Sequence, residues 1–146
     1  MQIINITQGE IRQAFDLSML IPEFQEPYSW KKWQRRLSSG EIVALVAHID
    51  GTPVGFKVGY GTKNFFYSWI GGVLPAFRGK GVARALAEEM EQQIEGKYPV
   101  LRMKTRNRYK AMLQFAIGKG FNIIEVLPAK TGHPRLDLRI VLEKKI

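Results

Sequence analysis

The segment FYSWIGGVLPAFRGKGVARALAEEM, residues 66–90, constrains the fold more than any other part of the chain. Its first half is apolar and aromatic, as in a buried strand, and its second half repeats apolar residues every four positions, as in an amphipathic helix. Two glycines, Gly79 and Gly81, lie at the junction. Glycines that open a helix after a strand present backbone N–H groups at the positive end of the helix dipole. The junction is therefore predicted to bind an anion such as a phosphate.

Basic side chains surround this junction. Arg78, Lys80 and Arg84 add positive charge, so a pyrophosphate would meet both directed amides and a favourable field. The spacing matches neither GxxxxGK[ST] nor GxGxxG, which disfavours nucleotide hydrolysis and dinucleotide redox chemistry. A solvated turn with no ligand is the alternative reading of the glycine pair.

Periodicity and turn residues divide the rest of the chain into alternating elements. The predicted strands are 3–6, 42–49, 54–61, 65–74, 100–105, 121–128 and 135–146. The predicted helices are 10–20, 29–37, 79–95 and 106–119. The order β-α-α-β-β-β-α-β-α-β-β predicts a mixed α/β fold of the α+β type, in which helices cover a mixed sheet.

Composition limits the class of protein. The chain of 146 residues has 45% hydrophobic positions and no linker-like segment, so residues 1–146 are predicted to form a single domain. It contains no cysteine and only two histidines, His48 and His133, which argues against a metal site. Neither a signal peptide nor an apolar run of about 18 residues is present, so we expect a soluble, cytoplasmic protein without a membrane segment.

The formal net charge of +9 admits several kinds of partner. Nucleic acid, an anionic membrane, an acidic protein and a phosphorylated small molecule would all be attracted to such a chain. The basic run Arg102, Lys104, Arg106, Arg108 and Lys110 is either a solvated face or a contact for a phosphate or an acidic acceptor. Charge alone does not choose between them.

The residues Arg78-Gly79-Lys80-Gly81-Val82-Ala83 carry a resemblance to a known family. They match the (Q/R)-x-x-G-x-(G/A) fingerprint of the GNAT family of N-acetyltransferases, and the likeness extends over nearly the whole domain. The resemblance implies the single-domain acyl-CoA N-acyltransferase fold and acetyl-CoA (coenzyme A) as cofactor. The implied cofactor-binding residues are Val73, Leu74, Arg78, Gly79, Lys80, Gly81, Val82, Ala83, Arg84 and Asn107.

The chain departs from the family at one catalytic position. Many relatives place a tyrosine four residues before the glycine of the last Gly-Phe pair, where it protonates the departing thiolate. Ala116 stands at that position here. The side chains nominated in its place, as general acid or base, are those of Tyr109, Tyr67, Glu26 and Glu23.

These observations favour an acetyl-CoA-dependent N-acetyltransferase that acts on a primary amine of a small molecule or peptide by direct transfer. A coenzyme A-binding regulatory module without catalysis and a basic nucleic-acid-binding domain are the alternatives, although the basic residues follow no recognised nucleic-acid motif. A homodimer is a further hypothesis, because the strand predicted from Arg135 to Leu142 would offer an apolar face if it lay at a sheet edge.

Overall fold

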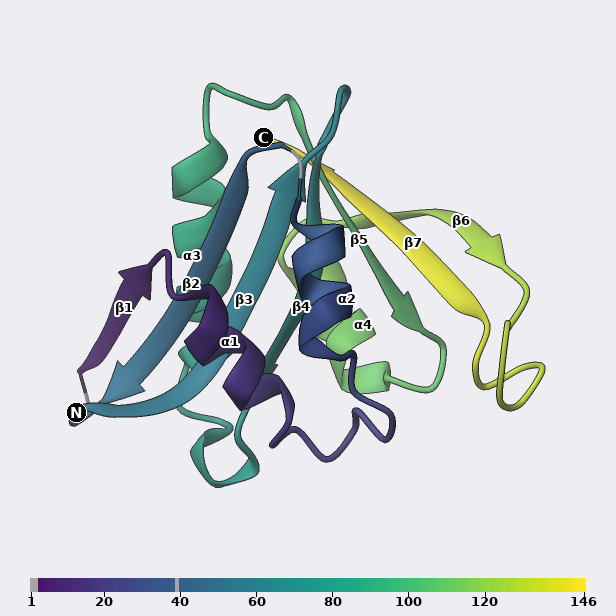
Figure 1. Cartoon of the computed structure of the whole chain (residues 1–146). Helices are drawn as coiled ribbons and strands as arrows, with labels where there is room; N and C mark the ends of the chain where they lie inside the picture. Colours follow the sequence, from purple (N-terminus) through teal and green to yellow (C-terminus); the bar gives the residue numbers. More distant parts are fainter. Residues whose placement is uncertain (1–2, 39) are drawn as a thin grey trace.

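A computed structural model describes residues 3–38 and 40–146 of the chain (Figure 1). Within these residues, seven strands form one sheet in the order β1-β2-β3-β4-β5-β7-β6. The strands are β1 (Ile4–Gln8), β2 (Ile42–Ile49), β3 (Thr52–Gly61), β4 (Phe66–Val73), β5 (Val100–Arg106), β6 (Asn122–Leu127) and β7 (Arg139–Lys145). Neighbouring strands are antiparallel except β4 and β5, which run parallel. The predicted mixed sheet is confirmed.

Helices cover both faces of the sheet. They are α1 (Ile11–Ser18), α2 (Trp30–Arg36), α3 (Val82–Ile94) and α4 (Lys110–Gly118), with a short 3₁₀ helix at Pro75–Phe77. In Figure 1, α1 and α2 lie in front of the sheet and α3 and α4 behind it. Each pair buries a separate apolar cluster against the sheet. No helix in the described part of the chain has the length and apolar character needed to cross a membrane.

Local sequence explains several element boundaries. The turn between β2 and β3 has positive φ at both central residues, 50° at Asp50 and 78° at Gly51, as a tight Asp-Gly hairpin turn requires. Helix α2 begins where Ser29 Oγ accepts a hydrogen bond from the Lys32 N–H at 3.2 Å, which satisfies one of the free donors of the first turn. Both features depend on residues close together in the sequence.

Strands β4 and β5 separate along their length. Only three residues of β4, Phe66 to Ser68, pair with β5. The pairing of β4 with β3 shifts register just beyond Ser68, so Trp69 is the extra residue of a β-bulge. The rest of β4, up to Val73, pairs with β3 alone, and Figure 1 shows the ends of β4 and β5 pointing apart. The sheet is therefore open at the place where β4 leads into the fingerprint segment.

Two predicted boundaries near the C-terminus are wrong. Helix α4 begins at Lys110 rather than at residue 106, because β5 continues to Arg106 by pairing with Arg139 of β7. Strand β7 begins at Arg139 rather than at Arg135, since the preceding residues form turns. The argument for a homodimer also fails on this point, because β7 lies between β5 and β6 and offers no free edge.

Candidate active site

The fingerprint segment forms an open anion cradle. Gly79 and Gly81 have φ values of 76° and 86°, a left-handed conformation that only glycine adopts at low cost. An added Cβ at either position would meet no atom within 4 Å, so the space outside the backbone is empty. Gly81 is the N-cap of α3, and no side chain caps this helix. The first-turn N–H groups are therefore free to bind a ligand.

The fingerprint lies on a rigid support. Val82 is 2% exposed and packs into the core on the α3 side of the sheet. The other residues from Arg78 to Arg84 are exposed, which leaves the side chains of Lys80 and Arg84 in solvent beside the cradle. The residues predicted to bind the cofactor phosphates thus share one exposed turn. Their fit to a pyrophosphate rests on this open, uncapped and positively charged helix start.

Arg78 has a role that its position in the motif did not predict. Its guanidinium donates two hydrogen bonds to the Glu23 carboxylate, at 2.8 and 2.9 Å, and Nε donates to the Val73 carbonyl at 3.0 Å. The hydrogen bonds from Arg78 hold the pKa of Glu23 below its ordinary value. Glu23, nominated as a general base, is therefore an ionised partner of Arg78. The pair ties the α1–α2 connection to the end of β4.

The main chain of β4 at Val73 faces the gap, where its carbonyl accepts from Arg78 Nε and its N–H is left for a ligand. The Leu74 N–H donates to the Val54 carbonyl at 2.8 Å and so faces β3. Because hydrogen-bonding directions alternate along a strand, the main chain of Val73 faces the opposite side, toward the space between β4 and β5. Of the two residues predicted to pair with the pantetheine arm, Val73 is the one whose backbone faces this space.

The structure separates the nominated catalytic side chains. The Tyr109 hydroxyl donates a long hydrogen bond of 3.4 Å to the Glu23 carbonyl, so Tyr109 lies next to the residue that pairs with Arg78. Glu26 is exposed in the α1–α2 connection. Tyr67 instead packs edge-on against Tyr60, and burial raises its pKa to about 12. Tyr67 therefore keeps its proton at neutral pH and is not a base.

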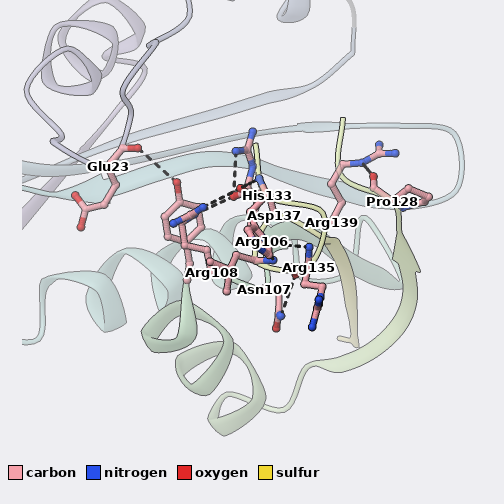
Figure 2. Close-up of polar contacts among 11 residues, drawn as sticks. Glu23, Arg106, Asn107, Arg108, Pro128, His133, Arg135, Asp137 and Arg139 are labelled. Carbon is pink, nitrogen blue, oxygen red and sulfur yellow. Dashed lines mark hydrogen bonds and ion pairs between the residues drawn. The ribbon is translucent and has the colours of Figure 1, made fainter. Parts of the chain in front are cut away.

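Asn107 and most of the basic run are held by internal contacts. Asn107 Nδ2 donates to the Arg135 carbonyl at 3.2 Å, and Lys110 Nζ donates to Asn107 Oδ1 at 2.6 Å. Arg108 donates two hydrogen bonds of 2.9 Å to Asp137, and Arg106 lies 3.6 Å from the same carboxylate (Figure 2). These contacts join the start of α4 to the β6–β7 loop. They also reduce the positive charge that this face offers to a partner.

One charged residue near the gap was missed by the sequence analysis. Lys57 lies in the middle of β3, where it is half-buried and is the sole charged residue between Val54 and Gly59, whose other residues are buried. Burial lowers its pKa to about 8, against the attraction of Glu91. A single charge within an apolar strand was the signal that could have identified it.

Two hollows on the surface bear on the location of the site. A narrow cavity of about 20 Å³ lies between α4 and the point where β4 and β5 separate, and Lys57 and Ala116 are among its lining residues. A wider hollow of about 650 Å³ runs along α3 beside the C-terminal residues. The wider one is lined by no residue of the fingerprint or of the gap, so we do not assign it to the site.

Comparison with known proteins agrees with this geometry. Residues 10–121 match the model of the acetyltransferase (GNAT) family, so the chain belongs to that family. The predicted class, an acetyl-CoA-dependent N-acetyltransferase, is confirmed by this match. No curated protein sequence matches the chain.

Solved structures share the fold over almost the full length. The ribosomal-protein-S18-alanine N-acetyltransferase of Escherichia coli is 17% identical, with a TM-score of 0.85 and coverage of 99% of this chain and 94% of that one. A GNAT acetyltransferase from Elizabethkingia anophelis, solved with acetyl-CoA bound, is 18% identical, with a TM-score of 0.78 and 98% coverage of both chains. Naa50 of Arabidopsis thaliana, in complex with the bisubstrate analogue CoA-Ac-MVNAL, is 15% identical, with a TM-score of 0.81 and coverage of 98% and 99%.

Proposed function

We propose that the protein transfers an acetyl group directly from acetyl-CoA to a primary amine of a small molecule or peptide. The observation that carries this proposal is the uncapped start of α3, preceded by two glycines of positive φ, at the end of a strand that separates from its neighbour. When bound, acetyl-CoA supplies an acetyl group activated as a thioester. The chain's own residues bind it, orient it and control protons.

Binding is assigned to two sets of backbone groups. The N–H groups of Gly79 to Ala83 would hold the pyrophosphate, with Lys80 and Arg84 adding charge. The Val73 N–H, on the side of β4 that faces the gap, would bind the pantetheine arm as an added strand does, next to the carbonyl that accepts from Arg78. Asn107 remains a predicted contact to the same arm, although its amide group now bonds the β6–β7 loop.

The acceptor side is assigned to the α1–α2 connection. Glu26 is exposed there and is suited to attract a cationic amine, whereas Glu23 is neutralised by Arg78. Tyr28 stacks on Trp69 of β4 with ring centroids 5.7 Å apart, which gives the same region an aromatic surface. One solved neighbour is a ribosomal-protein-S18-alanine N-acetyltransferase, and another is in complex with the bisubstrate analogue CoA-Ac-MVNAL, so we take a peptide amine as the first acceptor to test.

The remaining alternatives receive less support. A nucleic-acid-binding surface needs accessible cations, but Arg106 and Arg108 share Asp137, and Arg102 bonds Glu143 at 2.7 Å. A regulatory module without catalysis is favoured only by the absence of a tyrosine at Ala116. The two alternatives predict, respectively, salt-sensitive polynucleotide binding and cofactor binding without turnover.

A pair of glycine variants tests the assignment. Gly81→Val places a side chain in the cradle and strains a positive φ, whereas Gly96→Val does the same just beyond the other end of α3, also in open space. We expect Gly81→Val to weaken acetyl-CoA binding at least about tenfold, and Gly96→Val to change it by less than about twofold. Calorimetric titration gives the affinities, and circular dichroism checks the fold.

Turnover is measured by thiol release with a panel of peptide and small-molecule amines. Binding with amine-dependent release would support the transferase and identify its acceptor class. If Gly81→Val and Gly96→Val weaken acetyl-CoA binding equally, the assignment of the site to the start of α3 is contradicted. Failure of the native protein to bind acetyl-CoA would contradict the proposed function itself.

A further inference from the structure

The narrow cavity beneath the gap lies between the sheet and the helices α3 and α4. It has a volume of about 20 Å³, enough for about one water molecule. Ser68 and Met103, which line it, are also the last pair of residues between β4 and β5 before these strands separate. The cavity therefore lies where the open part of the sheet begins. The lining residues that bear on its chemistry are Lys57, Ser68, Glu91, Met103, Ala116 and Lys119.

Ala116 is the lining residue that links this cavity to the proposed reaction. Ala116 is 1% exposed and stands at the position where the resemblance implies a proton-donating tyrosine. Lys57 lines the same cavity from β3. A lysine thus lines the cavity whose α4 wall lacks the family's hydroxyl.

The neighbouring charges leave Lys57 without a partner. Glu91 of α3 accepts a hydrogen bond from Lys144 of β7 at 2.8 Å, and Lys119 at the end of α4 donates to Glu88 at 3.3 Å. Across the described residues, Lys57 makes no hydrogen bond or ion pair of its own. Glu91 is close enough to favour its charged form, but burial has the larger effect. A partly buried ammonium without a partner costs stability, which suggests that it is kept for a function.

We propose that Lys57 is the proton donor of the reaction, in the role that the missing tyrosine has in relatives. This inference rests on the proposed function. Lys57 Nζ donates one proton to the sulfur as the carbon–sulfur bond breaks and the carbon–nitrogen bond to the amine forms. The amine loses one proton to solvent, and Lys57 regains one from solvent, so the thiol and the amide are the only products.

The acidity of Lys57 suits this transfer. Its pKa of about 8 leaves most of the side chain protonated at neutral pH. An alkyl thiol has a pKa of about 8.5, and proton transfer is efficient between groups of similar pKa. The reaction rate is expected to fall as the pH rises through about 8, because Lys57 then loses the proton that it must donate.

The test compares coenzyme A with desulfo-coenzyme A, which lacks the sulfur. Lys57→Met removes the charge and keeps the length of the side chain, and Lys97→Met, which removes the charge of a lysine outside the cavity, is the control. At pH about 8, we expect Lys57→Met to bind coenzyme A about tenfold more weakly and to bind the desulfo analogue unchanged. Lys97→Met should bind both ligands as the native protein does. If Lys57→Met fails to fold, Lys57→Gln replaces it.

Kinetics provide the second measurement. With an accepted amine, Lys57→Met should lower kcat about 100-fold with little change in KM and should lose the fall in rate above pH about 8. Equal weakening of both ligands, or native affinity with a native pH profile, would overturn the role of Lys57 and leave the proposed function intact. Native protein that binds neither ligand would overturn both.

Discussion

At the scale of single residues, Arg78 shows how one side chain of the fingerprint serves two parts of the molecule. It bonds the Val73 carbonyl at the end of β4 and the Glu23 carboxylate in the α1–α2 connection. Tyr109, at the start of α4, reaches the carbonyl of the same Glu23. Glu23 therefore lies between the cofactor cradle and the proposed acceptor side, and it joins them through an ion pair that is partly exposed.

The variant Glu23→Gln tests this connection. Because the two side chains are 43% and 42% exposed, we expect stability to fall by less than about 1 kcal/mol. The loosened α1–α2 connection should raise the KM for the acceptor about fivefold, whereas coenzyme A affinity should change less than about twofold. Steady-state kinetics at saturating acetyl-CoA and calorimetry measure the two effects.

The matched control is Glu41→Gln. Glu41 forms an ion pair of 3.1 Å with Lys97 and is exposed to a similar degree, but this pair is remote from the fingerprint in sequence and belongs to no part of the proposed site. Glu41→Gln should leave both the acceptor KM and the coenzyme A affinity unchanged. An unchanged acceptor KM in Glu23→Gln would show that the pair has only a structural role.

At the scale of elements, the β6–β7 loop is attached to the start of α4 through Asp137. This carboxylate is 3% exposed, bonds Arg108 and the His133 N–H, and lies near Arg106. The hydrogen bonds from Arg108 are the main reason that its pKa lies well below the ordinary value. A group whose folded pKa is lowered stabilises the fold above its unfolded pKa, and that stability is lost as the pH falls toward the folded value.

Replacement by Asp137→Asn should therefore destabilise the protein most at neutral pH. The difference in unfolding free energy from the native protein should shrink as the pH falls below about 4, where the carboxylate of the unfolded chain takes up its proton. Urea unfolding at neutral and acid pH measures this. Asp16→Asn, which removes an exposed carboxylate on α1, should show little change at either pH. If the loss of unfolding free energy in Asp137→Asn does not depend on pH, the assignment of Asp137 as a stabilising carboxylate with a lowered pKa is contradicted.

The same region explains which parts of the fold the sequence could predict. Strands β2 and β3 and the start of α2 were predicted well, because apolar runs, an Asp-Gly turn and a serine cap act locally. The start of α4 and the turn before β7 depend on Asp137 meeting Arg106 and Arg108, residues about 30 positions away in sequence. Long-range contacts of this kind leave no periodic signal.

The candidate site also has local parts that the sequence predicted and long-range parts that it did not. The cradle at Gly79 and Gly81 is a local motif, and it was predicted together with its ligand class. Lys57 of β3 and Ala116 of α4 line one cavity although they are far apart in sequence, so neither the spacing nor the composition indicated it. Likewise, nothing in the sequence linked Arg78 to Glu23, which are 55 residues apart.

At the scale of the whole molecule, the two faces of the sheet have different tasks but share the same strands. The aromatic cluster on the α1–α2 side contains Trp33 and is packed by Trp30 and Trp69, whereas the cradle begins α3 on the other side. β3 and β4 contribute residues to both clusters. A ligand that stabilises the α3 side should therefore stabilise the α1–α2 side equally, provided that the domain unfolds as one unit.

Thermal unfolding with acetyl-CoA tests this coupling. At about 100 times Kd, a ligand that binds only the folded state adds about 2.7 kcal/mol, which corresponds to a rise in Tm of about 8 °C for a domain of this size. Because all three tryptophans pack on the α1–α2 side, their fluorescence should report the same rise as circular dichroism, which follows the whole chain. Gly81→Val should lose most of the rise, and Gly96→Val should keep it. A rise seen by circular dichroism but not by fluorescence would show that the two faces unfold separately, and the absence of any rise in the native protein would contradict cofactor binding at the cradle.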